Sequence, residues 1–397
     1  TMAILKKCDP IDNTPPLNGK GYELSCGNSG VLFVRLNGND LARTNSVITY
    51  PTAGGWMHVA ATYDGANIRI YINGVLDGTT AYTGAIVNSP NILEIANDPS
   101  TAARFFQGSI DEVRLWNVVR SDLEIKGNMT KKLIGNESGL VGYWRFNETS
   151  GSSMNDETSY NNDGTMVDMD PLTDHVWSGA ALGDASVSDY NSVGGYSATL
   201  LSPDGDAITA ITTSAGITGL QLYRVDDNPL RTNSTTPVGV TLSPLRYWGV
   251  KAIGSGTPTY TVVYNYSGHP GITPANENML DLALRDNLAD NSWINLVAAI
   301  DTTNNTLTLT GMTGTEYTLA TFGDDPLPVE LSSFTAKMVN QKVILNWSTA
   351  TEVNNYGFDI ERRLISDWEI IGFVQGNGNS NSPKNYSFAD ENKLNGN

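Results

Sequence analysis

The residues of this chain that could carry chemistry are its carboxylates and three histidines. Cleavage of a glycosidic bond on a strand scaffold needs two carboxyl groups on one face, and therefore on alternate residues of the strand. Glu94 is followed at the second position by Ala96, while Asp111 and Glu112 are neighbours that point to opposite faces of a strand. The spacing argues against a glycosidase of this kind.

The three histidines, His58, His175 and His269, lie in separate sequence contexts. None of them belongs to an H-E-x-x-H or H-x-H pattern, so the spacing does not indicate a zinc site. The chain also lacks a G-x-S-x-G motif, a phosphate-binding loop and a dinucleotide fingerprint. We therefore expect a protein that is not an enzyme, with His58 packed on its strand.

Calcium is the one cofactor that the residue types favour, because hard cations take carboxylate and amide oxygens from loops. Asn97 and Asp98 lie in the loop ANDPSTA, ahead of a strand that contains Asp111. We take these three residues as candidate ligands of a structural calcium ion, with no other cofactor. The alternative is that the Asp111 carboxylate caps a neighbouring loop or accepts a hydrogen bond from it.

Aromatic side chains on a surface could stack on the apolar faces of sugar rings. Tyr50, Tyr82 and Trp177 lie near predicted loops and are the candidate ligand-binding residues. The other tryptophans considered lie on strand patterns and are expected in the core: Trp56, Trp116, Trp144, Trp248 and Trp347.

The elements that must position these residues are short strands joined by tight turns. In residues 56–78, WMHVAATYDGANIRIYINGVLDG, the isoleucines alternate with polar residues, which is the period of a strand with one buried face. Asp64-Gly65 and Asn73-Gly74 suit two-residue type I′ turns, which need positive φ at both positions. Ser121 and Glu124 form a capping-box pattern before a short helix.

These hairpins are followed by GSIDEVRLWNVVRS (residues 108–121) and GLVGYWRFNE (residues 139–148). The order resembles laminin-G-like, concanavalin-A-type jelly-roll domains, which are relatives of the pentraxins. The resemblance implies a domain that binds or spaces, and in pentraxins the loop that matches Asn97 and Asp98 carries calcium ligands. It also implies further N-terminal strands, which we expect to lie upstream or to come from elsewhere.

Two more units follow in the sequence. Residues 183–325 contain the alternating segment TYTVVYNYSG and predict a β-sandwich. Residues 327–390 resemble a fibronectin-type-III-like module of surface proteins exported by the Bacteroidetes-type (type IX) route. We therefore expect an all-β chain of tandem β-sandwich modules: a jelly roll (1–182), a sandwich (183–325) and a C-terminally truncated module (326–397), the last two immunoglobulin-like or fibronectin-III-like.

The composition fits this organisation. The chain has 397 residues with 39 glycines and 17 prolines, and only 17% of its residues are charged, which is typical of an all-β chain with many turns. Its net charge of −18 repels phosphate backbones, so a nucleic-acid partner is not expected. No apolar window is long enough for a membrane helix.

The two cysteines, Cys8 and Cys26, admit either a disulfide or two free thiols. A hairpin that joins Ala3–Lys7 to Tyr22–Ser25 would place Cys8 opposite about Gly21 rather than opposite Cys26. This register favours two unpaired thiols.

Three functions are consistent with the sequence. The first is an extracellular adhesion or binding protein of a bacterial cell surface, which takes a glycan or an extracellular protein as its partner. The second is a structural stalk or fibre subunit that self-assembles through open sheet edges. The third is the accessory region of an enzyme whose catalytic domain lies outside this chain.

Overall fold

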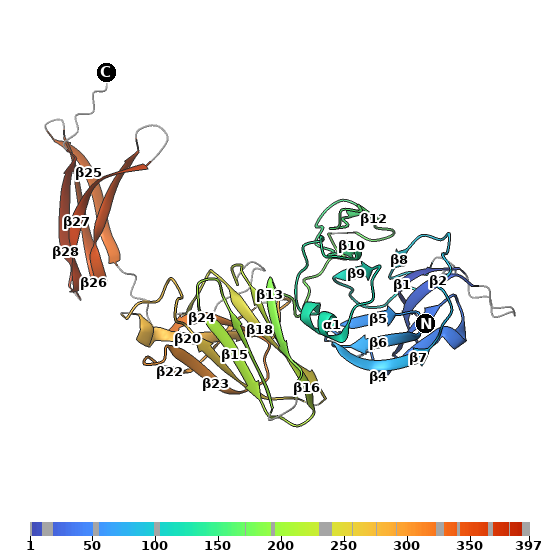
Figure 1. Ribbon diagram of the computed structural model, residues 1–397. Coiled ribbons are helices and arrows are strands. Elements are labelled where there is room, and N and C mark those ends of the chain that lie inside the picture. Colours follow the sequence, from blue (N-terminus) through green and yellow to red (C-terminus); the bar gives the residue numbers. More distant parts are fainter. Residues whose placement is uncertain are drawn as a thin grey trace, which may run out of the picture. The chain divides into compact units, whose positions relative to one another are not determined.

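The computed structural model confirms the all-β class (Figure 1). It describes residues 2–9, 19–50, 55–98, 104–170, 172–191, 195–229, 240–255, 257–274, 276–290, 292–322, 329–339, 342–363, 368–380 and 382–390.

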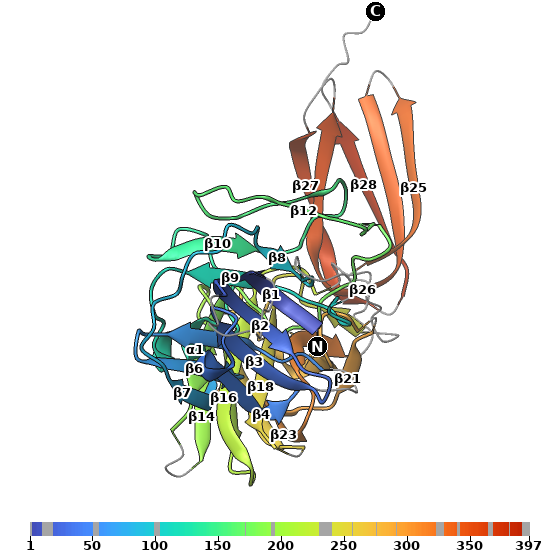
Figure 2. The same cartoon turned by 90° about the vertical axis from the view of Figure 1, so that its right-hand side faces the viewer.

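The first sandwich begins with a five-stranded antiparallel sheet, in which β1, β2, β3 and β4 run side by side (Figure 2). In sheet order its strands are β4 (Arg43–Thr49), β3 (Val31–Leu36), β2 (Gly21–Cys26), β1 (Met2–Cys8) and β8 (Glu94–Ile95). A short 3₁₀ turn, η1 (Asp40–Ala42), joins β3 to β4.

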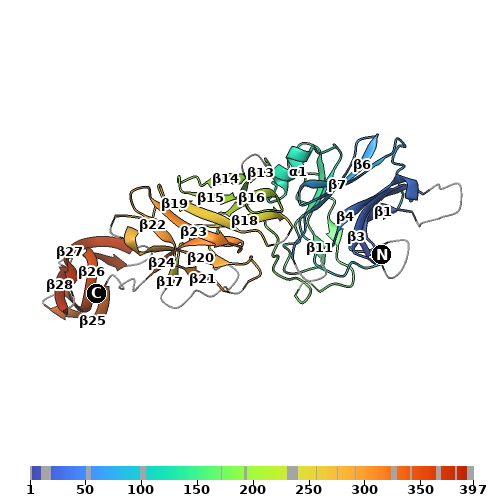
Figure 3. The same ribbon diagram turned by 90° about the horizontal axis from the view of Figure 1, so that it is seen from below.

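The second layer of this sandwich consists of separate pieces. The three-stranded piece contains β5 (Val59–Tyr63), β6 (Asn67–Ile72) and β7 (Val75–Ala81), and a two-stranded piece contains β9 (Val113–Trp116) and β10 (Leu140–Trp144). Strands β6 and β7 lie against β3 and β4 (Figure 3). Within the described residues, β5 pairs only with β6 and β9 pairs only with β10, so each keeps one free edge.

The predicted alternation in β6 is confirmed, because Ile68, Ile70 and Ile72 are buried in the core between the layers. The turn at Asn73-Gly74 has the expected positive φ values of 48° and 78°. The two-residue type I′ turn predicted at Asp64-Gly65 is wrong. Only Gly65 has positive φ there, and the Asp64 carboxylate instead accepts hydrogen bonds from the backbone that follows it.

Helix α1 (Asp122–Asn128) starts with the predicted capping box of Ser121 and Glu124, which satisfies N–H groups at the helix start. Its only buried residue is Ile125. After β10, the hairpin of β11 (Ser153–Met154) and β12 (Gly164–Thr165) completes the strands of this part of the chain.

The cysteine prediction is confirmed. Cys8 lies opposite Gly21, and Cys26 lies opposite Met2 at the other end of the same strand pair. Both thiols are free and buried, and burial raises the pKa of Cys8 to about 11.

The second sandwich packs a seven-stranded sheet against a five-stranded one. The first sheet contains β13 (Ala185–Asp189), β16 (Ile217–Val225), β18 (Tyr247–Gly254), β24 (Glu316–Phe322), β20 (Leu280–Arg285), β21 (Ile294–Leu296) and β17 (Val240–Leu242). The second contains β14 (Tyr196–Leu201), β15 (Ala207–Thr212), β19 (Tyr260–Asn265), β23 (Thr306–Met312) and β22 (Ala299–Asp301), and η2 (Glu277–Met279) precedes β20.

Every apolar position of the predicted alternation in residues 260–266 is buried in the core of this sandwich. The Trp248 and Tyr264 rings meet edge to face, with their centroids 6.2 Å apart. Hydrogen bonds join this sandwich to the first, since Gln221 is fully buried and bonds to Thr130 and to the Lys126 carbonyl.

The last strands form a sheet of β25 (Val329–Val339), β26 (Lys342–Arg363), β27 (Trp368–Ser380) and β28 (Lys384–Asp390). Its small core stacks Trp347 on Tyr386, with the ring centroids 5.6 Å apart. Trp144, Trp248 and Trp347 are buried as expected.

The chain divides into two compact units, residues 1–237 with 242–320 and residues 238–241 with 321–397. The predicted boundary near residue 183 falls inside the first unit, between β12 and β13, and the one near residue 325 lies outside the described residues. The division into three modules therefore stays a prediction. No helix among the described residues is long and apolar enough to cross a membrane.

Candidate binding groove

The structure does not bring the three predicted aromatic ligand-binding residues together. Tyr50 packs edge to face on Phe106 and lines a groove of the first sandwich. Tyr82 packs beside Tyr63 and accepts a hydrogen bond from Asn37. Trp177 is 52% exposed and does not line the groove, so a sugar platform there stays a separate prediction.

The surroundings of Asp98 do not fit a calcium ion. Its Oδ1 atom lies 2.5 Å from the Lys6 ammonium, and both side chains are fully buried. Its Oδ2 atom lies 3.4 Å from an Arg104 guanidinium nitrogen. Because cations of the protein already face both carboxylate oxygens, Asp98 serves to neutralise Lys6 inside the sheet.

The other two candidate calcium ligands lie in different environments. Asn97 makes a side-chain hydrogen bond to Glu94, whereas Asp111 bonds to Ser178 and lines the groove. Burial raises the pKa of the Asp111 carboxyl group. Across the part of the chain that the structure describes, no three His, Cys, Asp or Glu residues cluster in a way that could hold a metal ion.

The groove lies where the second layer of the first sandwich is interrupted. It has a volume of about 880 Å³ and is lined by residues of β1, β2, β5, β9 and α1. The floor is apolar and includes Ile4, Tyr22 and Leu24, which are only half-buried although they pack against the core. A concave, mostly apolar site with few polar groups is the usual form of a binding site.

One wall of the groove is the free edge of β5. Residues of an antiparallel pair alternate between hydrogen-bonded and non-bonded positions. The Asn73 N–H donates to the His58 carbonyl across the β5–β6 pair, which makes position 58 and every second residue after it the bonded ones. The N–H groups of Val59, Ala61 and Tyr63 therefore point away from β6, toward the free edge.

The opposite wall is the free edge of β9. Tyr143 lies opposite Arg114 in the β9–β10 pair, but its N–H donates to the Asp156 carboxylate instead. The Arg114–Tyr143 pair is therefore a non-bonded one. The N–H groups of Arg114 and of Trp116, two residues on, consequently point away from β10.

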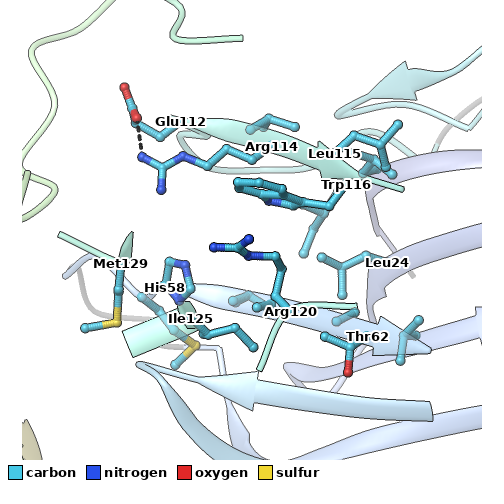
Figure 4. Close-up of a pocket in the computed structure, with 18 of the residues that line it drawn as sticks. Leu24, His58, Thr62, Glu112, Arg114, Leu115, Trp116, Arg120, Ile125 and Met129 are labelled. Atoms are coloured by element: carbon cyan, nitrogen blue, oxygen red, sulfur yellow. Dashed lines mark hydrogen bonds and ion pairs between the residues drawn. The ribbon is translucent and has the colours of Figure 1, made fainter. Parts of the chain in front are cut away.

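A second set of groove residues lies on the α1 side of the layer (Figure 4). The Arg120 guanidinium covers the Trp116 ring at 4.1 Å from its centroid and pairs with Glu124 at 2.9 Å. Ile125 and Met129 add apolar surface below it. Arginine thus occupies the aromatic face that a sugar ring would need for stacking.

His58 lies at the end of the groove where positive charge gathers. Burial lowers its pKa to about 3, with further contributions from Arg114 and Lys251. Among the residues that the structure describes, its buried Nδ1 atom has no hydrogen-bond partner. Lys251 is largely buried and donates to the Trp56 carbonyl at 3.2 Å. This end therefore suits an incoming group that carries negative charge or accepts hydrogen bonds.

Sequence reasoning missed this groove. Trp56 and Trp116 were expected in the core, but both are half-buried because they line the groove. The available signal was the two segments WMHVAATY and EVRLW. In each of them, apolar residues occur on both faces of the predicted strand. That pattern predicts strands, but it cannot tell which edge lacks a neighbour.

Comparison with known proteins finds a likeness within the first sandwich. Residues 11–126 match the family model described as the concanavalin A-like lectin/glucanases superfamily, of laminin G type. The chain is 35% identical to mouse (Mus musculus) pappalysin-1 over 81 residues, which are 19% of this chain and 5% of that protein. No solved structure matches. Laminin G-like domains are typically non-catalytic modules that bind carbohydrate or protein.

The buried pair of Lys6 and Asp98 gives a first prediction. Replacing Asp98→Asn removes the carboxylate 2.5 Å from the buried Lys6 ammonium, which then keeps the more distant Glu23 carboxylate at 3.9 Å. We expect the free energy of unfolding to fall by about 3–5 kcal/mol, measured by urea unfolding.

The double variant Lys6→Met with Asp98→Leu is the control, because it removes both charges and should recover most of the loss. Addition of calcium should leave the melting temperature of the original chain unchanged. A rise that disappears in the Asp98→Asn variant would instead make Asp98 a calcium ligand.

His58 gives a second prediction. Its pKa is about 3 in the folded chain against an ordinary value of 6.5, so the unfolded chain binds the proton more readily between these values. The free energy of unfolding should therefore fall as the pH drops below about 6.5. Between pH 7 and pH 5 the His58→Gln variant should lose up to about 2 kcal/mol less than the original chain.

The exposed His175 provides the matched control. The His175→Gln variant should show the same pH dependence in urea unfolding as the original chain. An equal loss in all three proteins would contradict the burial of His58.

Proposed function

We propose that this chain is an extracellular, non-catalytic binding protein of a bacterial cell surface, and that the groove of its first sandwich holds the ligand. The laminin G-like match over residues 11–126 supports a binding module for carbohydrate or protein. The surface location rests on the acidic composition and on the resemblance of residues 327–390 to modules exported by the type IX route.

The observation that carries this proposal is the groove itself. Its apolar floor, two strand edges and few polar side chains lie together in about 880 Å³. The carboxylates near it are already engaged, because Glu112 bonds to Arg114 and Tyr143 while Glu124 bonds to Ser121 and Arg120. The arrangement supports holding a ligand more than transforming one.

The shape of the site favours a protein ligand over a sugar. The Trp116 ring is covered by Arg120, whereas free strand edges offer backbone groups that only a polypeptide can match along its length. A structural role by strand complementation is the second candidate, and the same free edges of β5 and β9 favour it.

Binding of residues 1–397 to a glycan array and to a panel of immobilised extracellular proteins tests the proposal, with calcium and again with EDTA. Leu24→Gln places a polar group on the groove floor and should weaken binding about tenfold or more, since that floor lies in the site. Val47→Gln, at a position 80% exposed on β4 and outside the groove, is the matched control.

The melting temperatures of both variants are measured alongside, so that a loss of binding is separated from a loss of stability. Binding that survives Leu24→Gln would place the ligand elsewhere, with Trp177 as the next residue to replace. Absence of binding to both arrays would contradict a binding function and favour the structural role.

A further inference from the structure

We infer that the groove receives one extended strand of polypeptide from outside residues 1–397, which pairs with β5 on one side and with β9 on the other. The inference rests on the proposed function and names its partner as a β-strand with apolar side chains on one face and an acidic side chain on the other.

The two walls of the groove supply the backbone groups that such a strand would need. Val59, Ala61 and Tyr63 present N–H groups on the β5 side, and Arg114 and Trp116 do so on the β9 side. Unpaired strand edges bind other strands through their main-chain groups. Here two such edges border one groove, so a single strand could join the separate pieces of the layer into one sheet.

The floor of the groove defines one face of the incoming strand. Strands β6 and β7 cover the β3 and β4 side of the five-stranded sheet. The Ile4, Tyr22 and Leu24 side chains of β1 and β2 keep exposed surface inside the groove. A strand with apolar residues at alternate positions would bury them, because successive side chains point to opposite faces.

The α1 side of the groove defines the other face. His58, Arg114 and Lys251 gather there, and the buried His58 Nδ1 atom has no partner in the described part of the chain. Arg114 pairs with Glu112 at 2.7 Å, whereas Lys251 has no ion pair within the described ranges. One carboxylate on this face of the strand would form an ion pair with the Lys251 ammonium and accept hydrogen bonds from nearby N–H groups.

A second copy of the chain does not supply this strand. Insertion between β5 and β9 needs a strand whose two edges are both free. Each strand in the described part of the chain already pairs with at least one neighbour, so it would have to leave its own sheet first. The described strands of a second copy are therefore not the occupant.

The test joins the peptide VTVEVTV to the N-terminus of residues 1–397 through a flexible glycine and serine linker of about twelve residues, which raises its effective concentration. Amide hydrogen exchange is then followed by NMR. We expect exchange at Val59, Ala61, Tyr63, Arg114 and Trp116 to slow about tenfold or more, because their N–H groups enter a ladder.

Two matched peptides separate the parts of the inference. VTPEPTV lacks two backbone donors and should give no protection, while VTVKVTV reverses the charge and should give weaker protection than VTVEVTV. Protection on β5 or β9 alone, equal protection by VTPEPTV, or none by VTVEVTV would overturn the inference. Protection in the original chain that rises with its concentration would assign the groove to a second copy.

The array experiment keeps this outcome distinct from failure of the proposed function. Ligand binding that Leu24→Gln abolishes, without amide protection by VTVEVTV, would retain the groove as a binding site and reject the strand. Amide protection without any array ligand would retain the strand in the groove and favour the structural role over the proposed binding function.

Discussion

A sheet with one apolar face must bury that face, and in the first sandwich the second layer does so over only part of it. The isoleucines of β6 close the core over β3 and β4. Over β1 and β2 the layer is interrupted, and half-buried apolar side chains line a groove. The free edges of β5 and β9, the half-buried Trp116 and the positively charged end beside His58 all follow from this interruption.

The buried charged side chains of the five-stranded sheet lie on the face opposite the groove floor. Glu23 lies between the floor residues Tyr22 and Leu24 on β2, and Lys6, Glu23 and Arg35 form a buried network with Asp98. In the folded chain Asp98, one of the predicted calcium ligands, forms a salt bridge to the buried Lys6. A loop carboxylate looks the same in sequence in both cases, and only the register of β1 against β8 brings Lys6 beside it.

Much of the fold could be predicted because its signals are local. The alternation in residues 68–72 and 260–266, the Asn73-Gly74 turn and the capping box at Ser121 each depend on residues close together in the chain. The register of Cys8 against Gly21 also followed from one hairpin. The groove could not be predicted, because it depends on which strand edges remain unpaired between segments far apart in sequence.

Amide hydrogen exchange on residues 1–397 alone tests most directly whether the β5 edge is free. Val59, Ala61 and Tyr63 should exchange rapidly, while Ala60 and Thr62, which face β6, should be protected, since only the latter N–H groups lie in a ladder. Alternating protection of this kind would establish that the β5 edge is free. Equal protection along all of β5 would contradict it, because some partner would then already pair with that edge.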